Sequence, residues 1–109
     1  MLSRLHRKAE ALDGACLRAW GHPHDYAVRE ELLVVLEWDS SLSPEHARPA
    51  IRGLFAEVRG HSVDLSNRLR AIADKPDGAV HVIQQGVQGL RQSLAALMHA
   101  LDSRRGAAS

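Results

Sequence analysis

The sequence predicts an all-α protein, an antiparallel up-down bundle of four helices built from a single domain over residues 1–109. The chain has 109 residues, which suits one domain rather than two. Alanine and leucine are abundant, threonine is absent and aromatic residues make up only 4%, a composition that favours helix over strand. Apolar residues also recur at alternating steps of three and four in four segments, which keeps one side of a helix apolar.

The first two helices are expected over about residues 3–20 and about 26–39. Gly21 and Pro23 end the first helix, and Asp25 is a good N-cap for the second. The apolar positions of the first helix are Leu5, Ala9, Leu12, Cys16 and Ala19, and those of the second are Val28, Leu32, Val35 and Leu36.

The third and fourth helices are expected over about residues 44–73 and about 79–103, followed by a disordered tail at 104–109. Pro44 fits a first helical turn, whereas Pro49 should bend the third helix near its start. Because the connections are short, neighbouring helices should run antiparallel, and the last two should form a long hairpin. The first two helices are too short to cover that hairpin. Uncovered apolar surface on so small a domain predicts a homodimer.

One candidate contact surface is a stripe of small residues on the fourth helix. Its members include Val82, Gly86 and Gly89, which lie beside the leucine-rich stripe. Two glycines inside a helix cost about 1 kcal/mol each against alanine, so close packing is a reason to keep them. The stripe packs either inside the monomer, against the first or second helix, or against another molecule.

A second candidate surface lies on the second helix. Glu30, Val34 and Trp38 are spaced by four and therefore align, with Glu31 beside them. Residues 21–43 hold one arginine and five acidic residues. An aromatic anchor within an acidic rim resembles a protein-binding hot spot and suits a basic partner surface. Alternatively, Trp38 closes one end of the core and the acids are a solvated face.

The seven histidines raise the question of a metal. His22, His24 and Asp25 lie in one loop, but a tight site needs three or four ligands in a defined geometry. The Glu-x-x-His pairs of di-iron bundles are missing from every helix. We therefore expect no metal and no cofactor. A metal- or small-ligand-binding sensor that uses this loop stays open as an alternative function.

No catalytic signature is found, and we expect no enzyme. Cys16 falls on an apolar stripe and lacks an electropositive setting, so it should be buried and inert. His61, Ser62 and Asp64 are too close in sequence on one helix to form a serine–histidine–acid relay.

In size and helical class the chain resembles histidine phosphotransfer domains, whose core reads roughly His-x-x-Lys-Gly. His61 and His99 would be the candidate histidines of such a bundle. The third residue after each is an acid, Asp64 or Asp102, where the family has its lysine. An acid there would repel the phosphoryl group. A phosphotransfer-like bundle is the second alternative function.

The remaining properties point to a cytoplasmic protein. The sequence has no apolar run of the roughly 18–20 residues that cross a bilayer and no apolar signal core. Its single cysteine suits a reducing compartment. Because the formal net charge is only +1, direct nucleic-acid binding is not expected.

The function that fits these properties is non-enzymatic binding of a partner protein. Bacterial anti-activators, anti-sigma factors and adaptors are often small helical proteins of this kind. We expect this one to occlude a surface of its partner, such as the dimerisation or DNA-binding surface of a transcription regulator.

Overall fold

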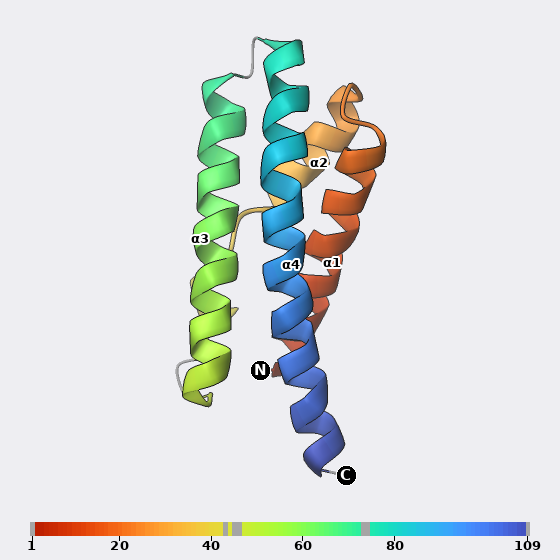
Figure 1. The fold of residues 1–109 in the computed structure, drawn as a ribbon. Helices are drawn as coiled ribbons and strands as arrows, with labels where there is room; N and C mark the ends of the chain where they lie inside the picture. The colour runs from red at the N-terminus through yellow and green to blue at the C-terminus, as the bar shows by residue number, and fades with distance from the viewer. Residues whose placement is uncertain (1, 43, 45–46, 73–74, 109) are drawn as a thin grey trace.

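The computed structural model describes residues 2–42, 44, 47–72 and 75–108, and these residues form helices and connections without a strand. The four α-helices and one 3-10 turn are α1 (Leu2–Gly21), α2 (Tyr26–Val35), η1 (Ser40–Leu42), α3 (Pro49–Ala71) and α4 (Pro76–Ala108) (Figure 1). The prediction of an all-α fold with four helices is confirmed. No helix within the described ranges is both long and apolar enough to cross a membrane.

Helix α4 holds the fold together, because it packs against α3 on one side and α1 on another, while α2 packs on α1 (Figure 1). Its leucine-rich stripe forms the centre of the core, and each side chain of that stripe is at most 2% exposed. The stripe consists of Ile83, Val87, Leu90, Leu94, Leu97 and Leu101. An ion pair between Arg91 of α4 and Asp13 of α1, 2.9 Å long, joins the same two helices at the surface.

The small residues of α4 face α3. A Cβ atom placed on Gly86 would lie 2.8 Å from Cδ1 of Leu65, and one placed on Gly89 would lie 3.6 Å from Cε1 of His61. Val82, in the same row, is buried. The stripe therefore packs inside the monomer. The expectation that it packs against the first or second helix is wrong, because its neighbour is α3. Gly86 lets α3 and α4 approach closely enough for Leu65 to fill the space that a side chain would take.

Helix α2 ends at Val35, four residues before the expected 39. The N–H of its C-cap residue, Leu36, still bonds to the carbonyl of Leu32, and the chain then leaves the helix. As a result Trp38 does not align with Glu30 and Val34, and that expected alignment is wrong. The physical reason is a competing contact, since the non-helical segment lets the Trp38 indole reach α3.

Helix α3 begins at Pro49 rather than at Pro44, which is described but is not helical. In the first turn a proline loses no intrahelical hydrogen bond, whereas inside the helix its ring would clash with the preceding turn. Pro49 thus starts the helix instead of bending it. The helix ends at Ala71, and the expected end at residue 73 lies outside the described residues.

Helix α4 is longer than expected at both ends. It begins at Pro76 instead of 79, again with a proline in the first turn, and continues to Ala108. The expected disordered tail at 104–109 is therefore helical as far as Ala108, in keeping with the high helix propensity of alanine. Ser109 lies outside the described part of the chain.

The difference in helix length leaves one side of α3 without a helical neighbour. At 1.5 Å per residue, the 10 residues of α2 span about 15 Å and the 23 residues of α3 about 35 Å. Between them the chain runs as the irregular segment 36–42, which includes η1. Part of the outer surface of α3 is consequently covered by no helix of the described chain.

The contact of Gly86 with Leu65 predicts a stability difference. Gly86→Leu should lower the free energy of unfolding by about 1–3 kcal/mol, because its side chain must displace a buried leucine. Gly14→Ala is the control: its Cβ would meet only the flexible end of Arg18, so stability should rise by up to about 1 kcal/mol. Urea unfolding followed by circular dichroism measures both, and equal effects would contradict the close packing.

Candidate interaction surfaces

Trp38 is anchored inside the monomer. Its Nε1–H donates to Oγ of Ser62 at 3.0 Å, and that hydroxyl donates in turn to the carbonyl of Val58 at 2.8 Å. The rings of Trp38 and Phe55 meet edge to face with centroids 5.4 Å apart. Ser62 is fully buried, and these two bonds satisfy its hydroxyl both as an acceptor and as a donor. The geometry favours the interpretation in which Trp38 closes the core, rather than the one in which it anchors a bound partner.

Lys8 of α1 completes the surroundings of Trp38. Its ammonium donates to the carbonyl of Val35 at 2.7 Å and lies 5.5 Å from the centroid of the Trp38 ring. The first contact supplies a hydrogen-bond donor to a carbonyl at the C-terminal end of α2, where the helix dipole favours a positive charge. Burial lowers the pKa of Lys8 from its ordinary value, and the nearby carboxylate of Glu37 partly opposes that shift.

The outward face of α2 keeps three of the four residues expected there. Val34 is 70% exposed, the largest exposed fraction among the large apolar side chains of the described residues. Glu30 is exposed beside it, and Glu31 pairs with Arg18 of α1 through a bidentate contact, with Nε 3.2 Å from Oε2. We call the set Glu30, Glu31 and Val34 the α2 face. It is an apolar side chain among carboxylates, one of which pairs with Arg18.

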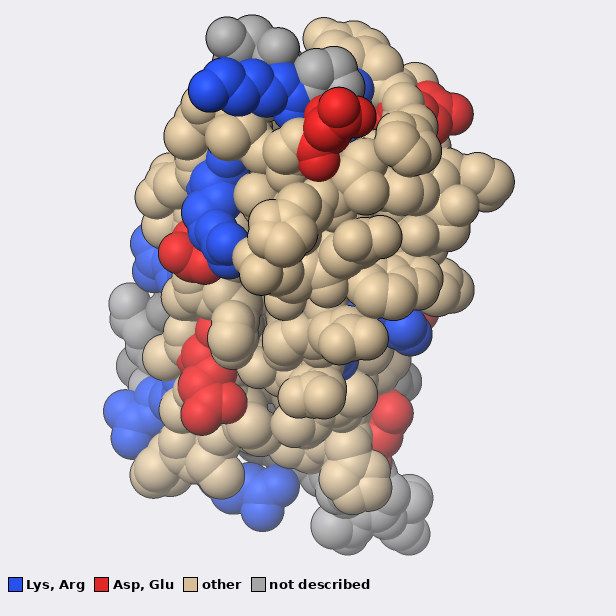
Figure 2. Space-filling view, turned by 45° about the horizontal axis from the view of Figure 1, so that its top comes forward, with Lys and Arg blue, Asp and Glu red and all other residues tan. Residues whose placement is uncertain are grey.

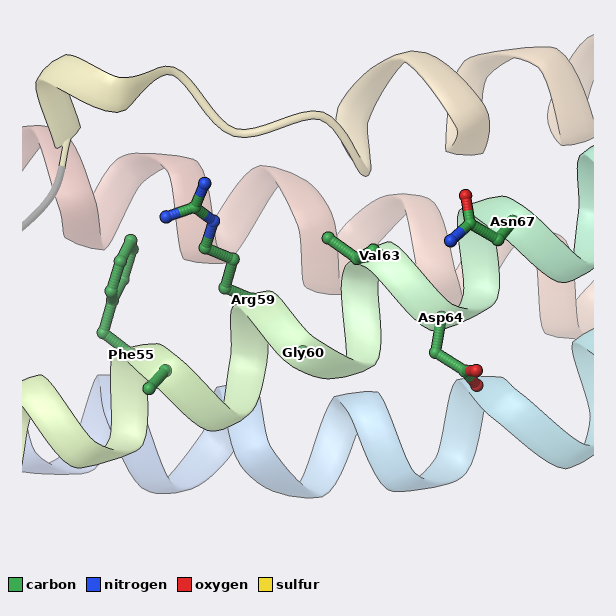
Figure 3. A pocket seen from close by; sticks show the side chains of 7 residues that line it. Phe55, Arg59, Gly60, Val63, Asp64 and Asn67 are labelled. Atoms are coloured by element: carbon green, nitrogen blue, oxygen red, sulfur yellow. The ribbon is translucent and has the colours of Figure 1, made fainter.

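A second surface, which the sequence analysis missed, lies on α3. A shallow groove of about 690 Å³ is lined by residues of α3 alone, among them Phe55, Arg59, Gly60, Val63 and Asn67 (Figure 3). It continues into a hollow of about 390 Å³ between α3 and the segment that carries Trp38, with Arg59, Val63 and Asn67 shared by both. We call the outward side of α3 that carries this groove the α3 face.

The sequence held a signal for the α3 face. Opposite the core stripe of this helix, Gly53, Ala56, Gly60, Val63 and Asn67 recur at steps of three and four. All five are exposed. Exposed glycines within a helix each cost about 1 kcal/mol against alanine, and no described atom lies within 4 Å of a Cβ placed on Gly53 or Gly60. Unlike Gly86, these two glycines meet no packing demand inside the monomer.

A broad area of the face shown in Figure 2 carries few charged residues. On the side shown in Figure 2, Lys, Arg, Asp and Glu lie mainly along the edges, and the middle carries few of them. This agrees with the stretch 78–90 in α4, which has no charged residue. The charged side chains therefore lie outside residues 78–90, for example on the α2 face and along the flanks of α3.

The histidine loop forms no convergent ligand set. His22 and His24 are exposed between α1 and α2, and the carboxylate of Asp25 accepts from the backbone N–H groups of Ala27 at 2.9 Å and Val28 at 3.3 Å. Asp25 thus acts as the N-cap of α2, as expected. Within the ranges that the structure describes, no three His, Cys, Asp or Glu side chains gather as they would around a metal ion.

Cys16 is buried on α1, as predicted. Burial raises the pKa of its thiol from 9.0 to about 12; the carboxylate of Asp13 adds to this shift and the guanidinium of Arg91 opposes it. A thiol with that pKa stays neutral near pH 7 and is a poor nucleophile. His61 and His99, the candidate phosphotransfer residues, are exposed on α3 and α4.

Comparison with protein-family models, curated proteins and solved structures finds no match for this chain. A functional proposal must therefore come from the chemistry of the two surfaces, the α2 face and the α3 face.

The Trp38–Ser62 hydrogen bond predicts coupled effects on stability. Ser62→Ala should lower the free energy of unfolding by about 1 kcal/mol, because the indole N–H loses its acceptor. Trp38→Phe removes the donor of the same bond. The loss of stability in the double variant should therefore be smaller, by about 0.5–1.5 kcal/mol, than the sum of the losses in the two single variants. A double-mutant cycle from urea unfolding measures the coupling, and strictly additive losses would show that the bond contributes nothing.

The burial of Cys16 predicts that the thiol reacts only when the protein opens. At pH 8 a thiol reagent should label the native chain far more slowly than the chain in urea. Because the pKa is raised in the folded state, the thiol's contribution to stability is full below about pH 9 and is lost as the pH rises towards about 12. Ser3→Cys in a Cys16→Ser background, with an exposed thiol, is the control and should react at once.

Proposed function

We propose that this chain is a non-enzymatic regulatory protein that binds a partner protein through the α2 face and occludes the surface that it covers. The observation that carries this proposal is the 70% exposed Val34 beside Glu30 and Glu31. An exposed apolar side chain within a polar rim is typical of a binding anchor. Glu31, which pairs with Arg18, adds a second carboxylate to the rim.

The chemistry of the α2 face specifies the kind of partner. A complementary surface has an apolar hollow for Val34 and lysines or arginines around it. Opposite charges of this kind speed association and exclude partners of the wrong sign. The DNA-binding or dimerisation surface of a transcription regulator has this character, so masking such a surface would inactivate the regulator.

The proposal includes the assembly and the setting of the protein. We propose that the four helices form an antiparallel up-down bundle, with α2 as its short member, and that the protein is a homodimer in the cytoplasm. The glycine-rich stripe of α4 does not serve as the interface in this proposal, since Val82, Gly86 and Gly89 have neighbours within the monomer. Nor does Trp38 serve as the anchor, since it is engaged with Ser62.

The test compares two matched surface variants. Tagged wild-type protein is used to recover its partner from the native host, and binding of the purified partner is then measured by calorimetry. Val34→Lys places a positive charge in the α2 face and should weaken binding at least tenfold. Leu17→Lys makes the same change at a side chain of α1 that is 52% exposed, and it should bind as wild type does.

Both variants should unfold within about 0.5 kcal/mol of wild type, because both sites are exposed helical positions. Occlusion is measured separately, as inhibition of the partner's own assembly or DNA binding by wild type but not by Val34→Lys. Equal affinity of the two variants would refute the α2 face as the binding surface. Recovery of the protein without any partner would refute the regulatory proposal itself.

A further inference from the structure

We propose that the α3 face pairs with the same face of a second copy, with the two α3 helices side by side, parallel and in register. The proposal deepens the homodimer part of the proposed function by giving its interface, and it does not depend on the α2 face. Its starting point is the side of α3 that faces away from α4, which the irregular segment 36–42 flanks along one edge (Figure 1).

Five small or polar residues of the α3 face recur with the seven-residue spacing that paired helices use. Gly53, Gly60 and Asn67 fall at the first position of successive heptads, and Ala56 and Val63 at the fourth. Val63 is 50% exposed and lies in the groove. Glycine is the weakest helix former after proline, so the exposed Gly53 and Gly60 are explained best by a backbone that approaches from outside.

Opposite charges flank this stripe, one sign on each side. Arg52 and Arg59 precede the first heptad positions, and Glu57 and Asp64 follow the fourth positions. Figure 3 shows Arg59 and Asp64 leaving α3 on opposite sides of Gly60. The stripe is therefore bounded by arginines along one edge and by carboxylates along the other.

This distribution identifies the second copy as the occupant and fixes its direction. When two parallel helices are in register, the arginine edge of each faces the acidic edge of the other, five residues further along. Arg52 then meets the partner's Glu57, and Arg59 meets the partner's Asp64, twice each by symmetry. An antiparallel pair would instead place arginine beside arginine and acid beside acid. A single asparagine at a first heptad position, here Asn67, also specifies register in parallel pairs.

The contacts within the monomer leave these charges available for the partner. Among the described residues, Arg52, Arg59 and Glu57 form no ion pair, and Asp64 has only the exposed Arg68 at 3.8 Å. Arg70, which would close the stripe at its end, is instead bonded to Glu37 at 2.9 Å. That bond holds its guanidinium towards Glu37 in the segment before η1.

The experiment measures the molar mass of the wild type and of charge-reversal variants by light scattering over a range of concentrations. The wild type should rise from 12.0 kDa towards twice that mass. Arg59→Asp and Asp64→Arg should each raise the dimer dissociation constant at least tenfold, because each sets like charges against each other twice. A mixture of the two single variants should dimerise again, since every Arg–acid contact is restored between unlike chains.

Arg7→Asp, a reversal at an exposed position of α1, is the matched control and should dimerise as wild type does. Orientation is tested with Asn67→Cys in a Cys16→Ser background, which should form a disulfide dimer under mild oxidation only if the helices are parallel. A wild type that stays at 12.0 kDa, or single variants that dimerise as wild type does, would overturn the proposal. Neither result would bear on the proposal for the α2 face, because partner binding there is tested separately with Val34→Lys.

Discussion

The fold depends on one constraint: α4 must pack against two helices at once. Its leucine-rich stripe fills the core, while the adjacent row of small residues brings α3 close enough for Leu65 to occupy the space at Gly86. A helix with large side chains on both rows would hold α3 away and open voids in so small a core. The close approach of α3, and with it the placement of the α3 face, therefore depends on Gly86, which lies on a different helix.

The early end of α2 shapes the surface in a second way. Instead of continuing as helix α2, the chain runs as an irregular segment in which the Trp38 indole donates to Ser62 and meets Phe55 edge to face. Lys8 secures the junction by binding the carbonyl of Val35. Trp38, together with the buried Leu36 and Leu42, covers the core at this place without further helical turns. The arrangement also leaves part of the outer side of α3 without a helical neighbour.

Hydrophobic periodicity was enough to predict the helices and their buried stripes, because burial repeats at the helical period. It failed where a single contact overrode local preference. Trp38 left the helix for a partner on α3, a contact between residues 24 positions apart that no local pattern reveals. It also selected Pro44 as the start of the third helix, which is wrong, because Pro49 fits a first turn equally well and begins the helix. Of the surface expected on the second helix, Glu30, Glu31 and Val34 are exposed, whereas Trp38 is bonded to Ser62 instead. The α3 face was missed, because a similar row of small residues on α4 was taken as the candidate surface.

The two surfaces share no residue, and this separation has a consequence for avidity. The proposed dimer along α3 would display two copies of the α2 face at a fixed separation. A target that is itself two-fold symmetric can engage both copies, and the second contact then forms at a high effective concentration. Binding strength would rise far beyond that of a single face without any new contact. The abundance of this small protein, by setting how much of it is paired, would then control how sharply it discriminates dimeric from monomeric targets.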